Sequence, residues 1–186
     1  MDSATRKARL RKQLIAARRS IPIERWEHDS ERLRENLRAL ALFQRAKTIL
    51  GYFSYRQEPD LSSLFTLHHR WGLSRCAGDS LSWHCWTPGD PLELNRYGIY
   101  EPMAIAPEIL PAEVDLLLIP AVACDRRGYR LGYGGGYFDR VLARPEWRDI
   151  PTIGILFEGF YLEELPIDPW DKPLQGICTE SRIEIF

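Results

Sequence analysis

The residues best suited to chemistry lie in one segment, RLGYGGGYFDR, which runs from Arg130 to Arg140. Glycines let a backbone approach a ligand closely and point its N–H groups inward. The segment is expected to join a buried strand to a helix, whose N-terminus would add partial positive charge. It therefore predicts a phosphate site, built on Gly132, Gly134, Gly135 and Gly136.

Two common phosphate motifs do not fit this segment. No Lys-Ser or Lys-Thr pair follows the glycines, so the segment is not a P-loop. A dinucleotide fingerprint counted from Gly132 would need a small residue where Tyr137 stands. Glycine content alone would also suit a plain tight turn, so the flanking residues decide between the two interpretations.

Two carboxylates bracket the loop, Asp125 before it and Asp139 after it. Carboxylates beside a phosphate site commonly hold magnesium, so we expect both to be metal ligands. Asp139 has a second interpretation, because an acid in a first helical turn also favours the helix dipole.

The loop has no lysine, although a nucleoside triphosphate needs cations. Arg130 and a basic helix expected over residues 4–19 are the candidates to supply them. A solvated charged face is the usual role of such a helix, and a transit peptide is also Arg-rich and poor in acids. The segment lacks the serine content of a transit peptide, and the missing loop lysine favours phosphate contact. Residues 1–19 contain one acid, Asp2, and seven basic residues, Arg6, Lys7, Arg9, Arg11, Lys12, Arg18 and Arg19.

The hydrophobic pattern predicts an α/β fold with helices on both faces of a sheet. The segment 115–120 (DLLLIP) is a continuous apolar run, typical of a parallel strand buried on both faces. We expect one domain over residues 1–186, with further helices over 24–44, 61–71 and 136–142, and further strands over 48–53, 151–157 and 181–186.

Bulk composition argues against several classes of function. The chain has 186 residues, of which 45% are hydrophobic and 27% charged, and its net charge is −1. We therefore expect no nucleic-acid partner and, without an apolar stretch near roughly 20 residues, no membrane span. The four cysteines lack zinc or redox spacing, so we expect reduced thiols and a cytoplasmic protein.

The order of several motifs resembles one enzyme family. These are Lys7-x-x-x-Arg11, Glu58 after the first strand, YGIYEP (97–102), Asp125 followed by RLGYGGGYFDR, and LPIDPWDKPLQGICTE (165–180). Together they resemble the 5-formyltetrahydrofolate cyclo-ligases, also called methenyltetrahydrofolate synthetases, over nearly the whole chain. The resemblance implies a three-layer α/β/α sandwich with a mostly parallel sheet, and we expect a monomer.

The resemblance also implies a reaction that uses ATP and Mg²⁺. ATP phosphorylates the formyl oxygen of 5-formyltetrahydrofolate, and the nitrogen at position 10 attacks the activated carbon. The products are 5,10-methenyltetrahydrofolate, ADP and phosphate. Such chemistry needs positioning and charge stabilisation at the γ-phosphate.

Residue roles follow from the same resemblance. Glu58 is implied to be the carboxylate that binds the folate, although the sequence alone favours a surface acid before Pro59. Tyr137 is implied to lie beside the formyl group, where a core aromatic is the alternative. The remaining implied roles are ATP contact for Lys7 and Arg11, a phosphate cradle for Gly132, Tyr133, Gly134, Gly135, Gly136 and Tyr137, and metal binding for Asp139. We expect Arg130, as a supplier of positive charge, to be catalytic together with Tyr137.

Four positions depart from the family pattern: Tyr133, Phe138, Phe160 and Trp170. We expect Phe160 and Trp170 near the nucleotide and folate cleft. They motivate an alternative, a folate- or nucleotide-binding relative with little turnover. A nucleic-acid-binding role for the basic helix is weaker, because the net charge is near zero.

Overall fold

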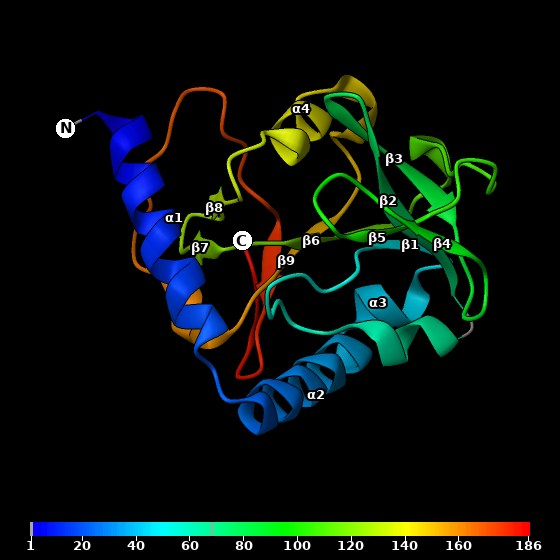
Figure 1. The fold of residues 1–186 in the computed structure, drawn as a ribbon, viewed down its shortest axis with the longest axis horizontal. Coiled ribbons are helices and arrows are strands. Elements are labelled where there is room, and N and C mark those ends of the chain that lie inside the picture. Colours follow the sequence, from blue (N-terminus) through cyan, green and yellow to red (C-terminus); the bar gives the residue numbers. More distant parts are fainter. Residues whose placement is uncertain (1, 68) are drawn as a thin grey trace.

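A seven-stranded sheet runs through the centre of the molecule in the computed structural model, which describes residues 2–67 and 69–186 (Figure 1). The strand order is β12-β11-β9-β6-β1-β2-β3. Its strands are β1 (Thr48–Gly51), β2 (Arg70–Ala77), β3 (Ser80–Cys85), β6 (Leu116–Pro120), β9 (Thr152–Ile155), β11 (Gly176–Cys178) and β12 (Ile183–Ile185).

The five inner strands are parallel and both edge strands are antiparallel. β1 pairs in parallel with β2 and β6, and β9 pairs in parallel with β6 and β11. β3 closes one edge against β2, and β12 closes the other against β11. The mostly parallel sheet predicted from the sequence is confirmed.

Helices cover both faces of this sheet, and each face has its own apolar cluster. Leu116 and Leu118 pack in the cluster under α2, whereas Leu117 and Ile119 pack in the cluster under α4. This alternation explains why the segment 115–120 is apolar throughout. Figure 1 shows α2 and α3 on one side of the sheet and α4 on the other, with α1 beside β7 and β8. The helices are α1 (Ser3–Arg19), α2 (Ile23–Ala39), α3 (Ala41–Arg45) and α4 (Tyr137–Leu142).

The helix predicted over 61–71 is wrong. A short 3₁₀ turn, η1 (Ser62–Thr66), is followed by β2 from Arg70, and residue 68 lies outside the described part of the chain. The apolar residues Leu64 and Phe65 do pack inward, but Trp71 belongs to the strand that pairs with β1. A strand buried on this face overrides the helical spacing of its apolar residues.

The predicted helix over 24–44 is divided. Leu40 has an extended backbone (φ −71°, ψ 119°), which separates α2 from α3.

Two smaller sheets complete the structure beside the seven-stranded one. Their strands are β4 (Leu92–Leu94), β5 (Tyr100–Pro102), β7 (Ala123–Asp125), β8 (Arg130–Leu131) and β10 (Tyr161–Leu162), and the other 3₁₀ turns are η2 (Pro111–Glu113), η3 (Pro145–Trp147) and η4 (Glu158–Phe160).

Candidate active site

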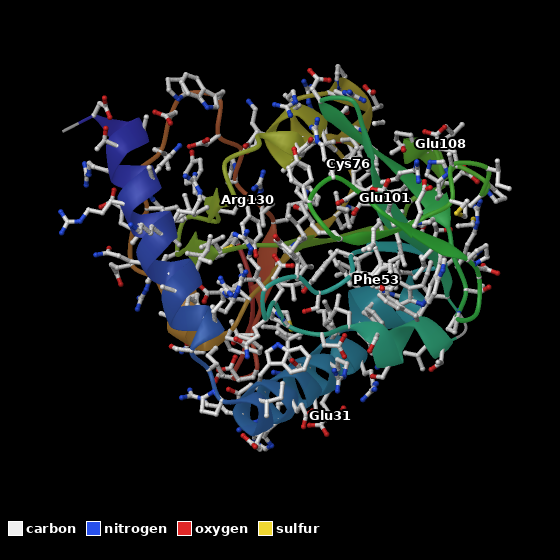
Figure 2. The ribbon with its side chains drawn as sticks, in the orientation of Figure 1. Glu31, Phe53, Cys76, Glu101, Glu108 and Arg130 are labelled. Carbon is white, nitrogen blue, oxygen red and sulfur yellow. The ribbon has the colours of Figure 1, made fainter. Side chains whose placement is uncertain are left out.

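A cleft of about 610 Å³ lies beyond the carboxyl ends of β1 and β6, where α/β sheets usually bind ligands. Its walls come from α1, the loop after β1, the turn between β4 and β5, the glycine loop, the start of α4 and the segment 168–171. Figure 2 labels three of its lining residues: Arg130 between α1 and α4, Cys76 on β2, and Phe53 after β1. The cleft contains all but one of the site residues predicted from the sequence: Lys7, Arg11, Glu58, Arg130, Gly132, Tyr133, Gly134, Gly135, Gly136, Tyr137 and Asp139.

The glycine loop between β8 and α4 follows a backbone path that favours glycine. Gly134 and Gly136 have positive φ angles of 97° and 68°. The Arg11 Nε donates a hydrogen bond to the Gly132 carbonyl oxygen at 2.7 Å. A Cβ on Gly134 would lie 3.3 Å from the Arg11 guanidinium carbon, so α1 packs closely on the loop. The loop and the basic helix therefore form one wall of the cleft.

Arg130 and Asp139 join the two ends of this loop. The Arg130 Nη2 donates to the Asp139 Oδ1 at 2.8 Å, and the Arg130 side chain is 4% exposed. The Arg130 guanidinium also lies over the Phe138 ring, 5.3 Å from its centroid. Asp139 is 31% exposed, so its carboxylate keeps access to the cleft.

The Tyr137 hydroxyl is held by two neighbours that sequence analysis had not assigned a role. The Arg96 Nη2 donates to it at 2.6 Å, and the Tyr97 hydroxyl lies 2.9 Å away. The hydrogen bond with Tyr97 raises the pKa of Tyr137, while Arg96 opposes this shift. The core-aromatic alternative fails, because Tyr137 lines the cleft with its hydroxyl in this network. Only Tyr97 had a signal in the sequence, as the first residue of YGIYEP.

Glu58 is not the surface acid that its sequence context favoured. It is 2% exposed, lines the cleft, and accepts a hydrogen bond from the Tyr55 amide on Oε2 at 3.0 Å. Arg56 and Gln57, between these two residues, have positive φ angles of 49° and 56°, which are uncommon for residues other than glycine. Burial raises the pKa of Glu58 to about 7, although Arg18 and the Tyr55 amide oppose the shift.

The Lys7 ammonium group lies at the cleft and forms ion pairs with two carboxylates. Its Nζ lies 2.6 Å from Asp168 Oδ2 and 2.5 Å from Asp171 Oδ2. Burial lowers the pKa of Lys7, but hydrogen bonds to both carboxylates outweigh that effect and raise it. Neither aspartate was assigned a role from the sequence, although both lie in the segment 165–180 that carries the family resemblance. Lys7 is therefore ion-paired, and a phosphate would have to share or replace these partners.

The prediction that Asp125 binds metal is wrong. Asp125 is fully buried and does not line the cleft. Arg127 donates to Oδ2 at 2.7 Å, the Leu165 amide donates to Oδ2 at 2.9 Å, and the Tyr129 amide donates to Oδ1 at 3.1 Å. These bonds fix the turn between β7 and β8, so the carboxylate has a structural role.

The four departures from the family pattern lie in two environments. Tyr133, Phe138 and Trp170 line the cleft, and Trp170 is 65% exposed. Phe160 is buried in the core beneath α4 and does not line the cleft, contrary to our expectation. The change at position 160 therefore does not alter the cleft wall directly.

Comparison with known proteins places the chain in a family. Residues 3–180 match the 5-formyltetrahydrofolate cyclo-ligase family. The chain belongs to this family. A 5-formyltetrahydrofolate cyclo-ligase from Mycolicibacterium smegmatis is 33% identical over 95% of this chain and 94% of its own length.

Two further comparisons are consistent with membership of the cyclo-ligase family. The Haemophilus influenzae 5-formyltetrahydrofolate cyclo-ligase is 37% identical over 50% of this chain and 51% of its own length. The NMR structure of the Aquifex aeolicus 5,10-methenyltetrahydrofolate synthetase superposes with a TM-score of 0.85 and 31% identity, and covers 96% of this chain and 92% of that one.

Residues 2–67 and 69–186 lack two kinds of feature. No helix there is long and apolar enough to cross a membrane. No group of three or more His, Cys, Asp or Glu side chains there is arranged to hold a metal ion. A metal in this cleft would therefore need oxygen ligands from a bound molecule as well as from the protein.

Proposed function

We propose that the chain converts 5-formyltetrahydrofolate to 5,10-methenyltetrahydrofolate with ATP, through a phosphorylated formyl intermediate. The observation that carries the proposal is one cleft that holds both a glycine loop braced by Arg11 and a buried carboxylate, Glu58. The first suits a triphosphate, and the second suits the ring N–H and amino donors along one edge of a pterin.

The proposed reaction has two steps. The formyl oxygen attacks the γ-phosphorus, the new P–O bond forms, and the β,γ-bridging P–O bond breaks to release ADP. The nitrogen at position 10 then attacks the activated formyl carbon, loses its proton, and expels phosphate as the C–O bond breaks. An amide oxygen is a poor leaving group, and phosphorylation converts it to a good one.

The residues of this chain would bind and orient the two substrates. Lys7 and Arg11 would contact the triphosphate from α1, and Arg130 would add positive charge beside the glycine loop. Tyr137 follows the loop directly, so its hydroxyl can lie where phosphate meets the formyl oxygen. Arg96 and Tyr97 would hold that hydroxyl in place.

Asp139 could provide one ligand to a magnesium ion bound with the triphosphate, whose phosphate oxygens would supply others. Asp139 lines the cleft, and carboxylate oxygens are ligands that Mg²⁺ prefers. Bound there, the ion would neutralise charge on the phosphates.

The unpaired thiols of the four cysteines support a cytoplasmic location. We also propose that the protein is a monomer.

A direct assay tests this function. The purified protein is mixed with 5-formyltetrahydrofolate, ATP and magnesium, and the absorbance of methenyltetrahydrofolate is followed. Product should form only when ATP and a divalent metal are both present. Binding of both substrates without product would favour the alternative of a binding relative with little turnover, which the exposed Trp170 in the cleft motivates.

A further inference from the structure

Arg18, in the last turn of α1, is one of the most deeply buried charged side chains in the described part of the chain. It is 2% exposed, and arginine is rarely so buried unless its charge is compensated. Its Nε donates to the Arg56 carbonyl oxygen at 3.1 Å, and its Nη1 donates to the Ala121 carbonyl oxygen at 3.2 Å. Its Nη2 donates to the Tyr133 hydroxyl. These contacts fix the guanidinium at the junction of three loops.

The carboxylate nearest to this guanidinium is that of Glu58. The Arg18 Nη2 lies 3.8 Å from Glu58 Oε1, which is too long for a hydrogen bond but close enough for a strong charge interaction. Glu58 Oε2 is occupied by the Tyr55 amide, whereas Oε1 is buried and has no hydrogen-bond partner. A buried acceptor without a partner is costly, so a cleft-lining one is a place for a ligand donor.

We propose that Arg18 is a positioning residue for Glu58: its charge favours the ionised carboxylate, and its hydrogen bonds to other groups leave Glu58 Oε1 available to the N–H donors of the substrate's heterocycle. This inference rests on the proposed function. It assigns α1 two tasks, because the same helix carries Lys7 and Arg11 to the glycine loop and Arg18 to the folate carboxylate.

Arg18 contributes most to stabilising the charge of Glu58, and Arg56 adds a smaller share. Arg56 belongs to the loop of Glu58 itself, Tyr133 comes from the glycine loop, and Tyr52 comes from the end of β1. Burial raises the pKa of Glu58 to about 7, and Arg18 is the largest influence against that rise. Without Arg18 the pKa of Glu58 would rise further, so a larger share of the group would be protonated at pH 7.

The test compares Arg18→Met and Arg18→Lys with Arg19→Met, which removes an exposed arginine from the same helix. Binding of 5-formyltetrahydrofolate and of ATP is measured separately by calorimetry between pH 6 and pH 9. At pH 7, Arg18→Met should weaken folate binding by about tenfold or more, the scale of a lost charged hydrogen bond. The loss should shrink as the pH rises toward 9, because Glu58 then needs less help from Arg18 to ionise. ATP binding should change by less than about twofold, and Arg18→Lys should restore part of the folate affinity, since the charge is kept.

Two results would overturn the inference: unchanged folate affinity in Arg18→Met, or a loss of the same size at every pH, as a general structural defect would give. If Arg18→Met does not fold, Arg18→Gln is titrated instead, because glutamine keeps a hydrogen-bond donor and loses the charge. An upward shift of its pH midpoint for folate binding supports the inference, and an unchanged midpoint overturns it. Parent protein that binds folate without turnover refutes only the proposed reaction, whereas parent protein that binds no folate refutes both proposals.

Discussion

Arg130 and Asp139 form an ion pair that closes the glycine loop, with 2.8 Å between Arg130 Nη2 and Asp139 Oδ1. The pair ties the first residue of β8 to the first turn of α4, so the loop between them has both ends fixed. Asp139 therefore stabilises the conformation of the glycine loop, while its carboxylate remains exposed to the cleft. These two tasks can be separated by experiment.

Asp139→Asn should raise the magnesium concentration needed for half-maximal turnover by at least about tenfold, the usual scale for a metal-site change. The amide can still accept a hydrogen bond from Arg130, so the loop should keep its shape. Turnover is measured as a function of magnesium, with the exposed Asp149→Asn as the control. An unchanged magnesium dependence would limit Asp139 to its contact with Arg130.

Lys7→Ala and Arg11→Ala should each raise the Michaelis constant for ATP by about tenfold or more, since each loses a charge-assisted contact. The constant for folate should change little. Lys12→Ala is the matched control, because Lys12 is exposed on the same helix. If both variants keep the parent's constant for ATP, the basic side of α1 is a solvated surface.

Glu58→Gln should change how stability depends on pH. Because folding raises the pKa of Glu58 from 4.5 to about 7, the native state holds this proton more tightly than the unfolded state. The parent therefore loses stability as the pH rises through this window, and glutamine cannot titrate. Relative to the parent, the variant should gain on the order of 3 kcal/mol between pH 5 and pH 8.

Urea unfolding at both pH values measures the Glu58→Gln effect. At pH 7 the same variant should weaken folate binding by ~1.5–3 kcal/mol, the scale of hydrogen bonds to charged groups, while ATP binding is nearly unchanged. A variant that lost ATP affinity and kept folate affinity would contradict our placement of the two ligands.

Tyr137→Ala should be nearly inactive, and Tyr137→Phe should lie between it and the parent, because phenylalanine keeps the ring and loses only the hydroxyl held by Arg96 and Tyr97. Turnover at saturating ATP and folate is the measurement. Tyr100→Phe, on an exposed tyrosine outside the cleft, is the control. Full activity of Tyr137→Phe would show that the ring alone matters.

Asp125→Asn should destabilise the fold without affecting substrate use. Removing one charge from a buried ion pair typically costs ~3–5 kcal/mol, and Arg127, itself 39% exposed, should reduce that cost toward the lower end. The free energy of unfolding is measured by urea titration, and the magnesium dependence of turnover is measured where the variant is folded. A raised magnesium requirement would return Asp125 to the metal site.

The sequence by itself determined the features that depend on local pattern. The apolar run over 115–120 predicted a strand buried on both faces, and the glycines between Arg130 and Tyr137 predicted a loop between a strand and a helix. The helical spacing of its residues predicted the basic helix α1. In the structure, Arg11 of this helix contacts the glycine loop, where we expected the helix to supply cations. Backbone preferences and the spacing of hydrophobic residues act over a few residues, so they can be recognised from a single sequence.

Only the tertiary structure decided which charged groups face the cleft. Asp125 and Asp139 look equivalent beside the loop, yet the β7–β8 turn buries the first and exposes the second. Lys7 meets Asp168 across 161 positions of sequence, and Arg18 meets Glu58 because α1 lies across the loop after β1. A parallel sheet gathers the carboxyl ends of distant strands at one edge, and no local pattern records which side chains that edge brings together.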